Sequence, residues 1–281
     1  MAVVENSLNR SDLSRGSVER FIELMRRFAS FVSKQSTTDA ADAVTGATVG
    51  EFVRARTRDG SEPAVATMHL RRAAVRLLFS EGRRLGLVVH DPTLDMSLPP
   101  RTKTSTRPLT DDEIALCRSH ALTTLSATRV PAAWGLAEAT ARTAEIAHVR
   151  IADVDLEHGR VWIHGSPKTE ARWGELASWG RLHVERRVHA LGAHPTDSSL
   201  ICPIAANPAS ARTSAGLVIT DTLRRAGIHL EADVRPSSVA AWTGATAFAG
   251  GMPLHEVALL LGVRSLDRAA AFIRLDWRSS R

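Results

Sequence analysis

The chain has 281 residues, of which 44% are hydrophobic, and this length can hold two domains with sizeable cores. Its 36 basic residues outnumber its 30 acidic ones, and the net charge of +6 favours an anionic partner, either nucleic acid or an acidic membrane surface. Two separated cysteines argue against a disulfide framework or a cysteine metal site, and no apolar stretch is long enough to cross a membrane, so we expect a cytoplasmic protein.

The N-terminal third is predicted to be helical. A first helix over 18–33 is indicated by four apolar residues at helical spacing: Phe21, Met25, Phe28 and Val32. The sequence "TVGE" at 48–51 has the form of a capping box and predicts the start of a short second helix. A longer helix is expected over 62–84, ending at Gly86. On its exposed face we expect three arginines: Arg71, Arg72 and Arg76.

A linker is predicted over 97–108. The segment "SLPPRTKTSTRP" combines paired prolines, small polar residues and three cations, a composition typical of linkers. We therefore expect a helical domain over 1–96 and a second domain over 109–281. Most of the excess positive charge precedes the boundary, because residues 1–107 hold 17 basic and 12 acidic residues.

The second domain is predicted to mix helices with one β-hairpin, which makes the fold class α+β and mainly α. A second capping box, "TDDE" at 110–113, predicts a helix that extends to about 122. Two runs, "RVWIHGS" at 160–166 and "GELAS" at 174–178, are expected to form the hairpin. Further helices are expected over 131–141, 143–149, 181–191, 210–226 and 236–249, with a final helix pair within 254–273.

This order of elements resembles the tyrosine recombinase (phage integrase) family over nearly the whole chain. The most specific match is "ATARTAEIAHVRIADVD" at 139–155, where family members have a Gly-Leu-Arg-x-Ser-Glu-Leu turn followed by Leu-Arg-Trp-x-Asp-Ile-Asp. The resemblance places Arg142 at the first catalytic arginine and Glu145 at the acidic position that steadies it. It places Lys168, in "GSPKTEARWGEL", at the catalytic lysine. It implies a helical core-binding domain, a catalytic-fold domain and double-stranded DNA as the partner.

The remaining motif positions depart from the family. The family's His-x-Leu-Arg-His is "RPSSV" here, with Arg235 for the first histidine, Ser238 for the second catalytic arginine and Val239 for the last histidine. Val263 replaces the histidine or tryptophan of the next motif. Phe272 stands at the position of the nucleophilic tyrosine, and the chain contains no tyrosine at all.

These departures remove the chemistry that the resemblance would otherwise imply. In the family a tyrosine phenolate attacks a DNA phosphate, cations stabilise the charge that develops, and a lysine protonates the leaving oxygen. Phe272 keeps the ring but lacks the nucleophilic oxygen, and Ser238 cannot present a bidentate cationic donor. Loss of one such donor alone costs roughly 100- to 1000-fold in rate. The resemblance therefore implies a pseudoenzyme that keeps the fold without the catalysis.

The function expected from the sequence is DNA binding without cleavage, in an accessory or regulatory role in recombination, integration or a mobile element at the nucleoid. Candidate DNA contacts are Arg71, Arg72, Arg76, Arg142, Lys168, Arg235, Arg264 and Arg268. The structural alternative is that Arg142 pairs with Glu145 and that Lys168 is simply solvated. The histidines form no metal-ligand pattern, and we expect neither a metal nor a cofactor.

Two other functions stay open at this point. The chain could be a recombinase subunit whose nucleophile comes from a partner, either a related active recombinase or an assembly of copies on DNA. It could instead be a helix-turn-helix transcription regulator that reads the major groove with 254–273, including Arg264 and Arg268.

Overall fold

The structure is a computed structural model that describes residues 1–9, 15–35, 44–100, 106–123, 126–192, 199–202 and 208–275. The chain divides into two compact units, Met1–Lys103 and Thr104–Arg281. The dividing point lies within 97–108, the segment whose composition is typical of a linker. Each unit has a buried core of its own.

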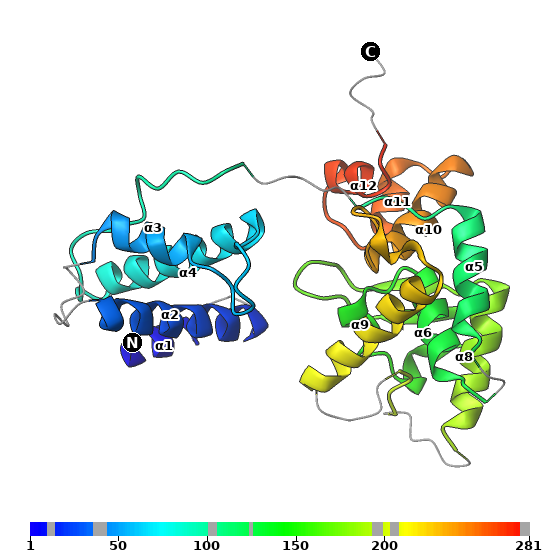
Figure 1. Cartoon of the computed structure of the whole chain (residues 1–281). Helices are drawn as coiled ribbons and strands as arrows, with labels where there is room; N and C mark the ends of the chain where they lie inside the picture. Colours follow the sequence, from blue (N-terminus) through cyan, green and yellow to red (C-terminus); the bar gives the residue numbers. More distant parts are fainter. Residues whose placement is uncertain are drawn as a thin grey trace. The chain divides into compact units, whose positions relative to one another are not determined.

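The described part of the N-terminal unit contains four helices (Figure 1). They are α1 (Ala2–Leu8), α2 (Arg15–Gln35), α3 (Gly46–Arg54) and α4 (Val65–Arg84). The rings of Phe28 and Phe52 meet edge to face with their centroids 5.1 Å apart, and Phe79 packs on Phe28 at 6.4 Å. Because these rings come from α2, α3 and α4, they hold the three helices together. Helix α1 was not predicted, and it adds Val4 and Leu8 to a smaller cluster with α2.

The first turn of α3 corrects a prediction from the sequence. Its capping residue is Thr45, whose hydroxyl oxygen accepts a hydrogen bond from the Thr48 backbone N–H at 3.3 Å. The helix therefore begins at Gly46, and the capping box predicted at 48–51 is wrong. Thr48 already lies within the first turn, where its own backbone N–H is the group that needs an acceptor.

Helix α4 begins at Val65 rather than near 62. Pro63 disfavours helical geometry in the residue before it, which explains the later start. The end of the helix is as predicted. Gly86 adopts a φ of +69°, a left-handed conformation that costs glycine little, and the Leu87 N–H donates back to the Gly82 carbonyl at 2.8 Å.

The C-terminal unit is mainly helical with one small sheet, which confirms the expected fold class (Figure 1). Helix α5 (Asp111–Ala121) begins with the predicted capping box: the Glu113 N–H donates to the Thr110 hydroxyl, and the Glu113 carboxylate accepts from the Thr110 N–H. The other helical elements are α6 (Arg129–Glu138), α7 (Thr143–Ile146), η2 (Ile151–Asp153), α8 (Ser178–Ala190), α9 (Pro208–Arg225), η3 (Ile228–Leu230), α10 (Ser237–Ala249), α11 (Leu254–Leu260) and α12 (Leu266–Phe272).

The sheet consists of β1 (Val154–Asp155), β2 (Arg160–Ile163) and β3 (Arg172–Glu175), antiparallel in that order. The hairpin of β2 and β3 confirms the prediction, whereas β1 was not predicted. A Cβ on Gly174 would lie 2.3 Å from the Ala139 carbonyl oxygen, so this face of β3 lies directly against the backbone at the end of α6. Arg172 shares the inner face with Gly174, and Trp173 lies on the outer face.

Helix α6 is the centre of the C-terminal core, and every residue from Pro131 to Glu138 is buried. Helix α8 crosses it at two glycines, because a Cβ on Gly135 would lie 2.7 Å from the Cα of Gly180. Helix α9 packs against α5, α6 and α7. This close packing fixes the positions of the turns that follow α6 and precede α7.

The last three helices form a smaller cluster at the end of the unit. Gly262, with a φ of +64°, ends α11 and allows the turn into α12. Gly244 of α10 leaves room for the side chains of Leu261 and Ile273. Helix α11 also packs against β3, so the cluster is joined to the sheet. The apolar side chains buried in it are Val257, Ala258, Leu261, Val263, Ala269 and Ile273.

Candidate nucleic-acid interface

A buried ion pair links the sheet to α7. Arg172 of β3 donates from Nη1 to Glu145 Oε1 and from Nη2 to Glu145 Oε2, at 3.1 Å each. The side chains are 6% and 1% exposed, respectively. A bidentate arginine–carboxylate contact has the geometry that a buried charge pair needs to offset its loss of hydration. The sequence prediction did not include Arg172.

The remaining donors of Arg172 tie three further segments to the pair. Its Nη2 donates to the Thr140 carbonyl at 2.6 Å, its Nε to the Leu260 carbonyl at 3.1 Å, and its Nη1 to the Glu170 carbonyl at 3.0 Å. These acceptors belong to the α6–α7 turn, the end of α11 and the β2–β3 loop. One buried guanidinium thus fixes the segments around the start of α7.

Thr140 holds an unusual backbone conformation beside this pair. Its φ is +73°, in the left-handed region that costs a non-glycine residue roughly 1–2 kcal/mol. The side chain is fully buried, and its hydroxyl donates to the Leu260 carbonyl at 2.9 Å. The Thr140 hydroxyl oxygen also accepts a hydrogen bond from Arg172 Nε at 3.2 Å. The surrounding hydrogen bonds therefore maintain the left-handed conformation.

Arg142 precedes α7, and its guanidinium lies over the ring of Phe272 with Cζ 3.9 Å from the ring centroid. Glu145 accepts from the Arg142 backbone N–H at 2.7 Å, so it holds the main chain rather than the guanidinium. Burial and the positive charges of Arg172 and Arg268 lower the pKa of Arg142 from 12.5 to about 10, and the Glu145 charge partly offsets this. Arg142 is still cationic at neutral pH.

The Arg142 site comprises Arg142, Phe272 and Arg268. Arg268 is exposed and lies one helical turn before Phe272 on α12, so the two share a face of that helix. Among the residues that the structure describes, neither guanidinium has an ion-pair partner, and Arg142 Nε has no hydrogen-bond acceptor. The site therefore presents positive charge without a matching protein anion in the described segments.

Lys168 is exposed in the β2–β3 loop, which is attached on both sides. The Thr169 hydroxyl donates to Glu145 Oε1 at 2.5 Å, and the Glu170 N–H donates to the Gly262 carbonyl at 2.8 Å. Arg264 forms an ion pair with Glu170. The loop that carries Lys168 is thus joined to the carboxylate that holds Arg142 and to the turn that begins α12.

Two of the residues that differ from the family motifs, Ser238 and Val263, are buried in the protein core. Ser238 is fully buried, and its hydroxyl oxygen accepts from the Arg235 backbone N–H at 3.0 Å at the start of α10. The Arg235 residue is exposed, and its Nη1 donates to the Val234 carbonyl at 2.9 Å. Val263 is buried in the apolar cluster of α11 and α12. Neither Ser238 nor Val263 offers a cation to an anion at the Arg142 site.

The arginines of α4 correct another expectation. Arg71 Nη1 donates to the Phe52 and Val53 carbonyls at 3.3 Å each and also to the Ala55 carbonyl, at the end of α3. Arg72 Nη2 donates to the Thr93 carbonyl at 3.5 Å. Both arginines are half-buried, so the prediction that they lie on an exposed face is wrong; carbonyls at the end of α3 and in the loop after α4 draw them inward. Arg76 is exposed as predicted.

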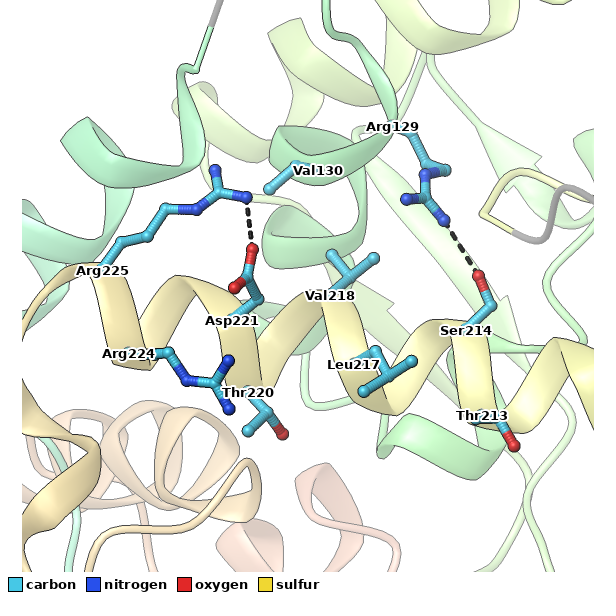
Figure 2. A pocket seen from close by; sticks show the side chains of 10 residues that line it. All are labelled: Arg129, Val130, Thr213, Ser214, Leu217, Val218, Thr220, Asp221, Arg224 and Arg225. Carbon is cyan, nitrogen blue, oxygen red and sulfur yellow. Dashed lines mark hydrogen bonds and ion pairs between the residues drawn. The ribbon is translucent and has the colours of Figure 1, made fainter.

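A groove of about 720 Å³ lies between α9 and the start of α6, and the sequence prediction missed it (Figure 2). Arg129 of α6 donates to the Ser214 hydroxyl at 2.9 Å, and Arg225 pairs with Asp221. Leu217 is 62% exposed. The outer face of α9 is defined by four residues at helical spacing: Thr213, Leu217, Thr220 and Arg224. The helical spacing of these four residues is the sequence signal from which this face of α9 could have been predicted.

The described segments show neither a metal centre nor a membrane helix. Within them, no three histidine, cysteine, aspartate or glutamate side chains are grouped so that they could hold a metal ion. Cys117 and Cys202 are buried free thiols, and burial raises the pKa of each to about 12. Among the described helices, none combines the length and the apolar character needed to span a bilayer.

The sequence matches no protein-family model and no curated protein. Solved structures do match. A lambda integrase(75-356) dimer bound to a COC′ core site has a TM-score of 0.71 at 13% identity, covering 98% of this chain and 94% of that one. XerH recombinase bound to palindromic difH has a TM-score of 0.66 at 16% identity, covering 93% and 77%. The Tn1549 transposon integrase has a TM-score of 0.64 at 12% identity, covering 96% and 93%. The chain therefore has the tyrosine-recombinase fold.

Proposed function

We propose that the chain binds double-stranded DNA through its backbone phosphates and does not cleave it. The observation that carries the proposal is the Arg142 site, where Arg142 and Arg268 have no carboxylate partner among the described residues. Guanidinium groups are well suited to phosphate oxygens. The fold supports DNA as the source of the phosphate, since the similar structures include recombinases bound to DNA.

The outer face of α9 supports a second contact with the duplex. It combines two threonines, an exposed leucine and Arg224 along one side of the helix, with Arg129 and Arg225 beside it (Figure 2). Threonine and leucine can contact thymine methyl groups, and arginine can pair with guanine or phosphate. Such a face would supply base contacts, while the Arg142 site would supply a phosphate contact.

The proposed inability to cleave is supported by the residues that stand at the catalytic motif positions. Phe272, at the position of the nucleophile, has no oxygen, and the 281 residues contain no tyrosine. The Ser238 hydroxyl accepts a hydrogen bond from the Arg235 backbone N–H, and Val263 is buried in an apolar cluster. Covalent attack needs a nucleophile, and the phosphorane needs cations placed around it. Both requirements are unmet by these residues.

Fluorescence anisotropy with a labelled mixed-sequence duplex tests the binding. We expect affinity to fall steeply from about 50 to about 200 mM salt, because phosphate contacts release counterions. Arg142→Ala should weaken binding and reduce the slope of log K against log salt by about 1. Arg181→Ala, an exposed arginine of α8, is the matched control. Binding that is insensitive to salt, or equal effects of the two variants, would overturn the proposal.

The biological role that we propose is accessory or regulatory, in recombination, integration or a mobile element. Lambda integrase appears among the similar structures as a dimer and as a tetramer bound to a Holliday junction, and this supports assembly of copies on DNA here. Sedimentation of the protein with and without duplex tests this. A single protomer per duplex at saturating protein would contradict assembly.

A second candidate is a subunit that works with a partner that supplies the nucleophile. The attachment of the Lys168 loop to Glu145 favours it, because Glu145 also binds the Arg142 backbone and a lysine on that loop is useful for protonating a leaving oxygen. The chain should then raise the yield of covalent DNA adduct formed by a related active recombinase on a suicide substrate. Lys168→Ala should abolish the increase. No increase in adduct with any related recombinase would remove this candidate.

A helix-turn-helix regulator is distinguished by its footprint. In such a protein α11 and α12 alone would read the major groove. Arg264 forms an ion pair with Glu170 of the β2–β3 loop, and the charge of Arg268 lowers the pKa of Arg142, so both exposed arginines interact with groups outside α11 and α12. Protection of both faces of the duplex from hydroxyl radicals would support the recombinase-like arrangement. Protection confined to one major groove would support the regulator.

A further inference from the structure

The ring of Phe272 has a contact that explains why an aromatic residue is present without a hydroxyl group. The Arg142 guanidinium carbon lies over the ring, 3.9 Å from its centroid. This is well inside the limit of about 6 Å within which a cation is attracted to an aromatic face. The two residues are far apart in the sequence, so α12 must be docked correctly for the contact to form.

The Arg142 guanidinium lacks the usual support of a carboxylate. Glu145 gives its oxygens to Arg172, to the Thr169 hydroxyl and to the Arg142 backbone N–H. A long side chain without a partner samples many rotamers, and binding a ligand then costs the entropy of ordering it. Some other group must hold the guanidinium if Arg142 is to meet a phosphate in a fixed orientation.

Stacking on an aromatic ring holds a guanidinium without using its hydrogen-bond donors. The five N–H groups of arginine lie in the plane of the guanidinium, whereas the ring contacts its face. A carboxylate in the same place would neutralise the charge and occupy two donors. A ring therefore orients Arg142 and leaves its edge available to an anion.

Helix α12 is anchored well enough to act as the support. Ala269 and Ala270 of the helix and Ile273 at its end are buried. After the helix, the Leu275 N–H donates to the Ala270 carbonyl at 2.8 Å, and Arg274 pairs with Asp233 at 2.6 Å. The position of the ring is thus set by packed core residues and by the contacts that end the helix.

We propose that Phe272 is a positioning residue that holds the Arg142 guanidinium face-on, so that its edge binds a DNA phosphate. The proposal rests on the proposed DNA-binding function, and it gives the former nucleophile position a role in binding. The ring is required and the hydroxyl is not. Leucine, which has a similar volume and no π face, would fill the space without holding the cation.

Four full-length variants test the proposal by anisotropy with the mixed-sequence duplex: Phe272→Leu, Phe272→Tyr, Arg142→Ala and the double variant Arg142→Ala/Phe272→Leu. We expect Phe272→Leu to weaken DNA affinity by about threefold to thirtyfold, as loss of a cation–π contact implies. It should also reduce the salt slope by about 1, the same reduction that we expect for Arg142→Ala. Phe272→Tyr should keep affinity within about twofold, because it keeps the ring.

The double variant separates positioning from a merely structural role. If Phe272 acts through Arg142, Phe272→Leu should cost nothing further in the Arg142→Ala background. Equal losses in the two backgrounds would overturn the proposal, as would an unchanged salt slope for Phe272→Leu. If Arg142→Ala itself leaves DNA binding unchanged, the proposed function has failed instead. Thermal unfolding of each variant shows whether the fold is intact.

Discussion

Glu145 pairs with Arg172 and not with the side chain of Arg142, although Arg142 is its close neighbour in the sequence. Both carboxylate oxygens accept from Arg172, and one also accepts from the Arg142 backbone N–H. The carboxylate therefore fixes the start of α7 and leaves the Arg142 guanidinium to the ring of Phe272. The sequence left two interpretations of Arg142, a DNA contact or a side-chain ion pair with Glu145. The ion pair is wrong, because both Glu145 oxygens accept hydrogen bonds from Arg172.

Replacing Arg172 with alanine should strongly destabilise the C-terminal unit. The change leaves the Glu145 carboxylate buried without its counter-charge and removes the donor to three carbonyl oxygens. Loss of one partner of a buried ion pair costs about 3–5 kcal/mol. Urea unfolding followed by circular dichroism measures the change. The control is Arg181→Ala, on the surface of α8, whose free energy of unfolding should stay within about 0.5 kcal/mol of the parent. Equal urea midpoints for Arg172→Ala and Arg181→Ala would contradict this account.

Thr140 should tolerate glycine better than alanine or valine. Glycine relieves a left-handed conformation that costs roughly 1–2 kcal/mol, and this offsets much of the loss of the hydroxyl bond to Leu260. Alanine keeps the strain and loses the hydroxyl, so we expect it to destabilise by about 1–3 kcal/mol, and valine by more. Urea midpoints give the order. Alanine more stable than glycine would show that the backbone here is not strained.

Gly135→Ala should disrupt the crossing of α6 and α8. The added Cβ would lie 2.7 Å from the Cα of Gly180, a backbone atom that cannot move without shifting α8. Overpacking of this kind costs about 1–3 kcal/mol. Gly216→Ala in α9 is the matched control, because nothing lies within 4 Å of its Cβ position and alanine favours helix. The melting temperature should fall for Gly135→Ala and hold or rise for Gly216→Ala; a fall for both would point to a general intolerance of alanine.

Acid should weaken the contact between the start of α5 and the segment before it. Hydrogen bonds from Arg107 are the main reason why the pKa of Glu113 lies below its usual 4.5. A depressed folded pKa stabilises the protein above the unfolded value and loses that effect as pH falls through the folded value. Between about pH 5 and about pH 3, the free energy of unfolding should therefore fall more for the parent than for Glu113→Gln. Glu157→Gln, an exposed glutamate, should follow the parent.

Much of the fold could be predicted from the sequence because its signals are local. The capping box at Thr110 and Glu113 specifies the start of α5 within four residues, and the alternation in β2 and β3 specifies a hairpin. Helix α1 and the true start of α3 were missed because short helices carry few periodic positions. The capping box assigned to 48–51 failed because Thr45, three residues earlier, had already satisfied the first turn.

The site was harder to predict because its contacts are tertiary. Hydrophobicity alone would bury Trp173 and expose Arg172, yet the structure does the reverse. The reason is Gly174, which must face the Ala139 carbonyl closely, so the residue two positions earlier shares that inner face. The contact of Arg142 with Phe272 likewise depends on where α12 packs, and the local sequence does not specify that position. The resemblance supplied the two positions but not their contact.

Phe272→Tyr should not restore DNA cleavage. The new hydroxyl would supply a nucleophile, but Ser238 is bound to the Arg235 backbone and Val263 is buried among apolar side chains. Two charge-stabilising groups would still be absent, and each such loss costs roughly 100- to 1000-fold in rate. Nicking of supercoiled plasmid and covalent adducts on denaturing gels are the measurements, with Arg142→Ala/Phe272→Tyr as the control that lacks the remaining arginine. Nicking by Phe272→Tyr that disappears in this control would show that catalysis depends on Arg142 and that the missing phenol was the sole defect.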